Sequence, residues 1–383
     1  MNQVEIIKIN SNLTNKKVII TLAFKYGYLD ESDNEFGYCH LAEHYICSVL
    51  ESKYKLGEVY GSVDNDYILI NIDSTKKKLA DLVLNLKKIL NEIISLEINK
   101  KIFENEKNRF ITEINNLYID IDNQIFEEIS NKTIKQPKKI VRRKIDQVKN
   151  INKINQSLFQ KTIENIIKSP SVIFIDQKEN NNPKKLSPKN IFIKNLKVDF
   201  VKKKKIKIDI NNPYYKSNFN QFLFFKGLNH KSTTIEKFSL RFILQESMQK
   251  LEKQLQDEGV YEIQYDNYIL NNFGFFWFLV SSNKKSDFNL IKCETQIINN
   301  LLQDEKLDTK LNKFKKEQIK NIKSSWKIEE NRNPWIIEDL LETGKISDLE
   351  TLEKEINKIS KKDLIKINSK LFKETDAYML ENR

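Results

Sequence analysis

The sequence predicts an α+β protein made of two related domains in tandem, and three observations lead to this prediction. The chain has 383 residues, enough for two or three domains of about 150 residues each. Hydrophobic residues make up 39% of it, which is enough to build cores and argues against a disordered or fibrous protein. Only 8 glycines and 6 prolines are present, so turns are few, which favours long helices and longish strands.

The elements of the first half follow from its hydrophobic pattern. Apolar residues that alternate with polar ones, or form short runs, predict strands, and apolar residues three or four positions apart predict helices. The predicted strands are Lys17–Lys25, Val59–Asp73 and Val172–Ile175. The predicted helices are Phe36–Glu51, Lys78–Ile94, one from about Lys100 into the 120s, and more helix from about Lys138.

The second half runs in a similar order. Its predicted strands are Phe222–Phe225, Val260–Leu270, Phe273–Ser281 and Ala377–Leu380. Its predicted helices are Ile235–Gln256, Asp287–Leu302, Asp308–Trp326 and Trp335–Leu341. The ends of the halves resemble each other, since Ile145–Phe159 and Ile356–Phe372 share a pattern and each precedes a predicted strand. This repetition is the simplest indication of two related domains.

A polar and basic stretch separates the halves. It runs from Asn180 to Pro213 and holds three of the six prolines, which is typical of a linker. We therefore predict a first domain over residues 1–182, a linker rich in lysine and asparagine over 183–213, and a second domain of the same type over 214–383.

The charge of the chain does not by itself indicate a nucleic-acid partner. The net charge is +12, but the excess is nearly all lysine, spread along a chain rich in asparagine and isoleucine. Nucleic-acid binders concentrate arginine and lysine on one face, with aromatic residues for stacking. The densest run, Lys202–Lys205, is interpreted as a solvated strand edge. We expect no nucleic-acid partner and keep a basic nucleic-acid-binding protein as the less favoured alternative.

Cysteine usage and hydropathy favour the cytoplasm. The three cysteines, Cys39, Cys47 and Cys293, are odd in number and scattered, which argues against a disulfide framework and favours a reducing compartment. No apolar run approaches 18 residues, so no membrane span is expected. The amino-terminal residues show neither the basic and apolar pattern of a secretory signal nor the composition of a transit peptide.

One motif carries chemistry. His40, Glu43 and His44 form H-x-x-E-H on a predicted helix, and histidines four positions apart share one helical face. Two imidazoles can then bind one ion while Glu43 takes a proton from a metal-held water, as in inverted zincin motifs. Chance produces this motif roughly once in several hundred such chains, so it is a specific signal. Of the 3 histidines in the chain, only His230 lies outside it, in a predicted loop where no role is expected.

A catalytic zinc site requires three protein ligands, so a third one is expected from the first half. The helix that begins near Lys100 offers Glu106 and Glu113, which are seven positions apart and therefore lie two turns along one face. The alternative for either glutamate is a surface ion pair on a solvated helix.

Together these pieces resemble the insulinase or pitrilysin superfamily of zinc peptidases, which includes the mitochondrial processing peptidase. The matching segments are Gly27–Glu31, the motif at residues 37–44, Tyr60–Tyr67, and the helix with Glu106 and Glu113. In that family the later glutamate of such a pair binds zinc and the earlier one supports the site. The resemblance thus implies one zinc ion per chain, held by His40, His44 and Glu113, with Glu43 as the catalytic base and Glu106 in support. The 69 positions from His44 to Glu113 (113 − 44) are fewer than the family usually has, which a trimmed loop between Glu51 and Tyr60 would explain.

The resemblance also covers the second half, with one departure. Family members carry an arginine and a tyrosine that bind the substrate backbone near the zinc, and Tyr261 fits the tyrosine. Gln254 or Gln256 stands where the arginine is expected, and Arg241 lies well upstream. The family's closed chamber needs four such domains, so this chain corresponds in size to half a clamshell. A heterodimer with a paralogous subunit that supplies the pair is therefore expected, with a homodimer as the alternative.

The sequence thus predicts a zinc-dependent metalloendopeptidase subunit that cleaves small unfolded peptides or leader peptides. The substrate is expected to add a strand near Tyr60–Val63, which makes Tyr60, Gly61 and Tyr261 candidate substrate-binding residues. A non-catalytic or regulatory subunit of such a peptidase is the principal alternative. It is less favoured because all the motif residues are present.

Overall fold

The fold was analysed on a computed structural model, which forms two compact units. It describes residues 4–10, 17–75, 79–95, 97–119, 127, 131, 134–136, 139, 142–177, 199–200, 207–208, 220–229, 233–257, 260–269, 273–282, 290–327, 336–337, 341, 348–371 and 375–380. Unit 1 comprises Met1–Asp120 and Arg142–Phe192, and unit 2 comprises Ile121–Val141 and Ile193–Arg383.

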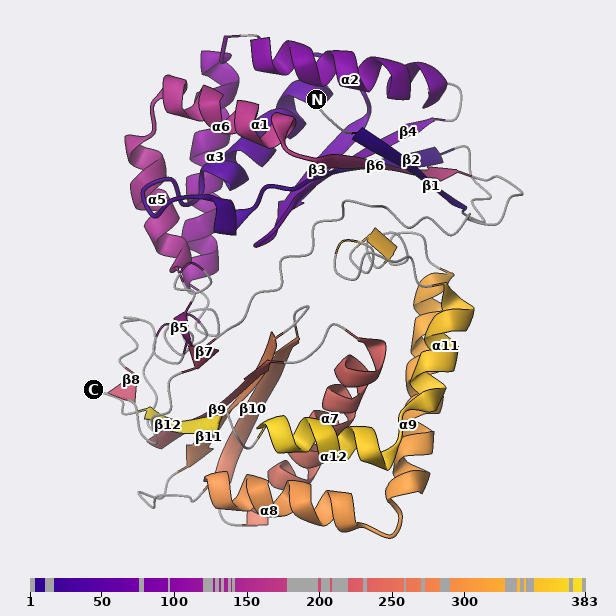
Figure 1. Cartoon of the computed structure of the whole chain (residues 1–383). Coiled ribbons are helices and arrows are strands. Elements are labelled where there is room, and N and C mark those ends of the chain that lie inside the picture. The colour runs from indigo at the N-terminus through magenta and orange to yellow at the C-terminus, as the bar shows by residue number, and fades with distance from the viewer. Residues whose placement is uncertain are drawn as a thin grey trace. The chain divides into compact units, whose positions relative to one another are not determined.

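Unit 1 is a five-stranded sheet with helices packed on it (Figure 1). Its elements are β1 (Val4–Asn10), β2 (Lys17–Phe24), the short 3-10 helix η1 (Tyr28–Asp30), α1 (Tyr38–Ser52), β3 (Glu58–Val63), β4 (Ile68–Thr75), α2 (Leu79–Ser95), α3 (Lys100–Ile119), α5 (Lys144–Lys153), α6 (Gln156–Lys168) and β6 (Ser171–Gln177). The strand order is β1-β6-β2-β4-β3. β1 and β6 are parallel and the other neighbours are antiparallel, so β3 forms one edge of the sheet.

Unit 2 repeats this topology. Its elements are β8 (Lys207–Ile208), β9 (Asn220–Asn229), α7 (Thr234–Asp257), β10 (Val260–Ile269), β11 (Phe273–Ser282), α8 (Leu290–Gln303), α9 (Leu307–Trp326), α11 (Leu349–Lys358), α12 (Lys361–Leu371) and β12 (Thr375–Leu380). The order β8-β12-β9-β11-β10 matches β1-β6-β2-β4-β3 strand for strand, including the single parallel pair at one edge. A short ladder of β5 (Ile134–Gln136) and β7 (Asp199–Phe200) completes the unit. The prediction of two related α+β domains in tandem is thus confirmed.

The core of unit 1 lies between its sheet and its helices. Ile68, Ile70 and Ile72 alternate along β4 and are fully buried in one apolar cluster with residues of α1, α3 and α6. At its centre the ring of Phe159 lies 5.4 Å from that of Tyr45, edge to face. Because α1 is packed against the sheet, α3 and α6 at once, its orientation is fixed by the core.

The helices bury one face, as the spacing of their apolar residues predicts. In α6 the buried residues include Phe159, Ile163 and Ile167, while Lys161 and Lys168 are exposed. None of the helices in the described ranges combines the length and apolar character needed to cross a membrane.

Three differences from the sequence prediction concern the two five-stranded sheets. β1 was not predicted, because its parallel partner β6 lies far along the chain. The predicted strand Val59–Asp73 is the hairpin of β3 and β4, turned at residues 64–67, where the Asp64 N–H donates to the Tyr67 carbonyl. β8 lies inside the predicted linker and pairs with β12, so the second sheet begins before residue 214.

Other predicted boundaries stay predictions. Residues 178–198, 201–206 and 209–219 lie outside the described ranges, and so does most of the predicted helix Trp335–Leu341.

The core predicts effects of very different size for two adjacent residues of α6. Replacing the fully buried Phe159 by alanine should lower the free energy of unfolding by about 3–5 kcal/mol, because it leaves a cavity between α1, α3 and the sheet. The neighbouring Leu158 is 42% exposed, so Leu158→Ala should change it by no more than about 0.5 kcal/mol. Urea titration followed by circular dichroism measures both, and similar losses in the two variants would contradict this packing.

Candidate metal centre

The amino terminus of α1 is fixed by a buried carboxylate. Glu31, which has no exposed surface, accepts hydrogen bonds from the backbone N–H groups of Gly37 at 3.0 Å and Cys39 at 2.6 Å. Helix N–H groups at this end have no partner within the helix, and a negative group is favourable there. Gly37 has φ 104°, a left-handed conformation that glycine adopts without strain, and the helix starts directly after it.

The loop that carries Glu31 is held from two sides. The Arg142 guanidinium donates to the backbone carbonyls of Tyr28, Glu31 and Ser32, and it lies 4.2 Å from the centre of the Phe36 ring. On the other side, backbone N–H groups of residues 28 and 29 donate to carbonyls of the β3–β4 turn. Burial raises the pKa of Glu31 to about 7, against the opposing effect of its bonds from Cys39 and Gly37.

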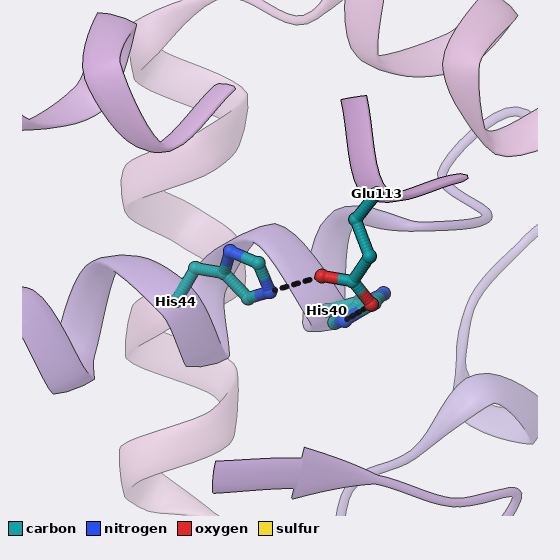
Figure 2. A group of neighbouring side chains, drawn as sticks. All are labelled: His40, His44 and Glu113. Carbon is teal, nitrogen blue, oxygen red and sulfur yellow. Dashed lines mark ion pairs between the residues drawn. The ribbon is translucent and has the colours of Figure 1, made fainter. Parts of the chain in front are cut away.

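Two histidines and a glutamate converge on one point in unit 1 (Figure 2). His40 and His44 are one turn apart on α1, and Glu113 reaches them from α3. Glu113 Oε1 lies 3.6 Å from His40 Nε2, and Glu113 Oε2 lies 3.3 Å from His44 Nε2. One ligand atom from each residue lies within 4.8 Å of the others. Within the described part of the chain, this is the one such group of histidine, cysteine and acidic residues.

The donor set fits a zinc ion. Zinc bonds of about 2.0–2.1 Å in a tetrahedral arrangement place neighbouring ligand atoms about 3.3 Å apart. The 3.3 Å and 3.6 Å separations found here are close to that value. Two imidazoles and one carboxylate are also the ligand types of catalytic zinc sites that keep a position open.

Glu106 lies behind His44 rather than in this cluster. Its Oε2 is 3.6 Å from His44 Nδ1, the ring nitrogen that faces away from Glu113. The Ser48 hydroxyl donates to Glu106 Oε1 at 2.6 Å, and Arg109 Nη1 donates to both carboxylate oxygens. These contacts suit a group that orients the His44 ring, which is the supporting position in which the resemblance put Glu106.

Glu43 lies beside the cluster without joining it. Its Oε2 is 3.7 Å from His44 Nε2, and its Oε1 accepts a hydrogen bond from the Cys47 thiol at 3.3 Å. A Cβ atom built on Gly61 of β3 would lie 2.2 Å from Glu43 Oε1. Gly61 therefore makes the space that the buried carboxylate occupies, and the second oxygen is left facing the histidines.

The two histidines hold protons differently. Burial, followed by the charge of His44, lowers the pKa of His40 to about 4, so His40 is neutral near pH 7. Burial also disfavours a charged His44, but the hydrogen bond to Glu113 and the charges of Glu43 and Glu106 outweigh it and raise its pKa. The bond to His44 lowers the pKa of Glu113, while burial raises the pKa of Glu43.

The sequence analysis did not predict Phe110 as a neighbour of the two histidines. The fully buried Phe110 ring packs edge-on against His40 at 4.9 Å and His44 at 6.1 Å between ring centres. Phe110 lies four positions after Glu106 and three before Glu113, so helical spacing could have placed it on the same face. Cys47 and Ser48 also lie on α1 at helical spacing from Glu43 and His44.

The remaining candidates lie elsewhere or outside the described residues. Tyr60, 47% exposed, lies on the edge strand β3 next to Gly61. Tyr261 belongs to β10 in unit 2, and neither its side chain nor His230 is described. The burial pattern of α7 repeats that of α1 with Lys237 and Arg241 at the positions of His40 and His44, so the motif is not repeated in unit 2.

Comparisons with known proteins find likeness in the fold. No protein-family model and no curated protein matches the chain. A protease from Helicobacter pylori has a TM-score of 0.69 at 12% identity, over 98% of this chain and 96% of that one. A chain of Complex III2 from Candida albicans has a TM-score of 0.68 at 11% identity, over 96% of this chain and 90% of that one. The first half of the periplasmic protease PqqL from Escherichia coli has a TM-score of 0.65 at 13% identity, over 99% of this chain and 90% of that half.

These structures establish the fold. It is that of the M16-like, or insulinase and pitrilysin, peptidases, which confirms the predicted resemblance at the level of the fold. The chain spans 46% of the longer PqqL chain, so it matches half of that protein. Because a chain of Complex III2 shares the fold with proteases, the fold alone does not establish catalysis.

The cap on α1 predicts a pH-dependent loss of stability. Glu31→Ala should lower the free energy of unfolding by about 1–3 kcal/mol, because it leaves the buried N–H groups of Gly37 and Cys39 unpaired. The folded-state pKa of about 7 lies above the ordinary 4.5, so folding takes up a proton between these values. The contribution of Glu31 is therefore complete below about pH 4.5 and falls as the pH rises to about 7.

Urea titrations at pH 5 and pH 8 measure this dependence. The loss in Glu31→Ala should be larger at pH 5. Glu35→Ala is the control, since Glu35 bonds only to the exposed Ser32 in the same loop and should cost less at both pH values. A larger loss at pH 8 than at pH 5 in Glu31→Ala would contradict the sign.

Proposed function

We propose that this chain is a zinc-dependent endopeptidase subunit of the insulinase and pitrilysin kind. The observation that carries the proposal is the convergence of His40 Nε2 and His44 Nε2 on the Glu113 carboxylate, with Glu43 facing the same point. The fold shared with proteases supports it. A bound zinc ion would polarise the scissile carbonyl and lower the pKa of an attacking water.

In this proposal Glu43 is the general base. It is buried beside the histidines, and burial raises its pKa toward the range in which a carboxylate accepts a proton effectively. The Cys47 thiol and the backbone at Gly61 hold one carboxylate oxygen, so the other is presented to the water. Glu43 would take the water proton and pass it to the leaving amine.

The peptide substrate would bind as an added strand on β3. This strand is an edge of its sheet, and an edge offers main-chain groups to an extended peptide with little demand on sequence. Gly61 of β3 is in contact with Glu43, so a peptide paired there would lie next to the base. The exposed Tyr60 ring is a candidate for side-chain contacts. Short unfolded peptides and leader peptides in the cytoplasm are the proposed substrates.

We also propose that a second chain completes the chamber. This chain matches half of the longer protease PqqL, and glutamine stands at positions 254 and 256, where the resemblance places an arginine. A guanidinium binds a carbonyl or a developing oxyanion with charge and a fixed pair of donors, which an amide lacks. A paralogous subunit with an Arg/Tyr pair would supply what is missing, and a homodimer is the alternative.

The metal ligands are tested by measuring the zinc content of purified variants. His40→Ala, His44→Ala and Glu113→Gln should each lower bound zinc well below one equivalent, because each removes one of three ligands. Glu106→Gln should retain most of the metal, since Glu106 contacts the far side of His44. Glu104→Gln, an exposed neighbour on α3, is the control and should bind as the unchanged protein. Elemental analysis that finds full zinc in Glu113→Gln and loss in Glu106→Gln would reverse the assignment.

The chemistry is tested at Glu43. Glu43→Gln should keep zinc and the fold yet reduce peptide hydrolysis by several orders of magnitude, because an amide cannot accept the water proton. Glu51→Gln, an exposed glutamate two turns later on α1, should leave the rate unchanged. Peptide cleavage followed by mass spectrometry measures both. Near-normal turnover by Glu43→Gln would refute the mechanism, and zinc binding without any hydrolysis by the complete assembly would favour the non-catalytic alternative.

The need for a partner is tested by comparing peptide cleavage by the chain alone with cleavage after a second chain is added. The purified chain alone should cleave peptide libraries slowly, since loss of one oxyanion donor typically costs about 100- to 1000-fold in rate. Addition of a paralogous chain that carries the Arg/Tyr pair should restore cleavage and shift the complex to a larger size in gel filtration. Strong, chelator-sensitive cleavage by the homogeneous chain would refute the partner requirement and leave the peptidase assignment intact.

A further inference from the structure

Three buried polar atoms of the metal cluster and its surroundings lack hydrogen-bond partners: His40 Nδ1, His44 Nδ1 and the amide oxygen Oε1 of Gln147. His44 Nδ1 faces Glu106 Oε2 at 3.6 Å, which leaves His40 Nδ1 and Gln147 Oε1 to be explained. An unpaired polar atom in a buried site costs stability, so such atoms are rare unless they serve a function. Since His40 presents Nε2 to Glu113, Nδ1 is the nitrogen that a neighbouring group can use to orient the ring.

Gln147 lies against the start of the motif helix. It is on α5, it is 1% exposed, and its Cβ would lie 2.8 Å from a Cβ built on Gly37, three positions before His40. α5 packs against both α1 and α3, the two helices that supply the cluster. Gln147 is therefore a buried residue on a helix that packs against both helices of the cluster.

Gln147 also interacts with the side chains on both sides of it. Gln147 lies within interaction range of the His40 imidazole, although His40 Nδ1 and Gln147 Oε1 do not meet as a formed hydrogen bond. It also lies within interaction range of the Tyr28 hydroxyl. An amide can bond to both, because its NH₂ donates to the phenol oxygen while its carbonyl accepts from an imidazole N–H.

The second unit supplies an internal comparison. Helices α5 and α11 are equivalent in the repeat, and the residues Ile-Asn-Lys-Ile occur at 151–154 and again at 356–359. Four positions before each of these segments lie Gln147 and Leu352. Leu352 is 1% exposed in the apolar core of unit 2. The fold thus accepts an apolar residue at this position where no histidine needs to be oriented.

We propose that Gln147 is a positioning residue for His40: its amide oxygen accepts the Nδ1–H, which fixes the tautomer in which Nε2 is free to bind the metal. This inference rests on the proposed zinc site. A neutral imidazole carries its proton on either nitrogen, and only the Nδ1–H form offers Nε2 as a ligand. The bond would pair two buried atoms that otherwise have no partner, His40 Nδ1 and Gln147 Oε1.

Histidine tautomers can be read directly in this protein, because it has 3 histidines. The full chain is labelled with ¹⁵N-histidine, and two-bond ¹H–¹⁵N spectra are recorded without metal at pH 7.5, with His40→Ala and His44→Ala for assignment. Zinc affinity is measured separately by competition with a chelator. The variants are Gln147→Leu, which introduces the residue found in the repeat, and Gln147→Glu, which keeps an acceptor.

In the unchanged protein His40 should be almost wholly in the Nδ1–H form. Gln147→Leu should shift His40 toward the Nε2–H form, leave the His44 signals in place and weaken zinc binding about 10- to 100-fold. Gln147→Glu should retain the Nδ1–H form of His40 and most of the zinc affinity, because a carboxylate also accepts a hydrogen bond. If Gln147 only filled space in the core, leucine and glutamate would not differ in this way.

The outcomes separate this inference from the proposed function. A Gln147→Leu protein that unfolds at the same urea concentration as the unchanged protein, and keeps both its His40 tautomer and its zinc affinity within twofold, would overturn the role of Gln147. The zinc site itself would then stand. If the unchanged protein binds no zinc, the proposed function fails, and the metal-free spectra still decide whether Gln147 sets the His40 tautomer.

Discussion

The hydrogen bonds from Gly37 and Cys39 to the buried Glu31 carboxylate are the interaction on which the candidate site depends. They set the first turn of α1, and His40 lies within that turn. The loop around Glu31 is in turn held by Arg142, which comes from a distant part of the chain, and by the β3–β4 turn. A shift of this cap by a fraction of a turn would rotate both imidazoles away from Glu113, because a helix transmits rotation at one end to all its side chains.

The cluster concentrates three glutamates around two histidines, and this excess of negative charge suits a cation. The hydrogen bond to Glu113 and the charges of Glu43, Glu113 and Glu106 raise the pKa of His44, so they favour a proton on this ring. His40 behaves differently because burial and the charge of His44 lower its pKa. His40 therefore stays neutral near pH 7, while the carboxylates favour the protonated form of His44. A divalent ion would replace that proton and meet the charge of the carboxylates more completely.

The sequence was most informative where chemistry follows from local spacing. The pairing of His40 with His44, and of both with Glu43, follows from helical periodicity alone. Glu106 and Glu113 share one face by the same rule, so spacing could not distinguish them. They differ in the histidine nitrogen that each one faces, which depends on how α3 crosses α1. The role of Gly61 beside Glu43, the cap formed by Glu31 and the position of Gln147 could not be predicted, since each depends on contacts between distant segments. The strand β1 was missed because its partner β6 lies at the other end of the unit.

The presence of glycine at position 61, which has no side chain, affects the range of peptides that such a site could process. Glu43 lies against Gly61, where a Cβ atom would not fit, and Gly61 is on the edge strand β3. A peptide aligned on that edge would be registered by its own main chain, and the depth of its carbonyl group would be the same for every residue type. Discrimination among peptides would then come from their length and their ability to unfold and enter, rather than from a pocket that reads one side chain.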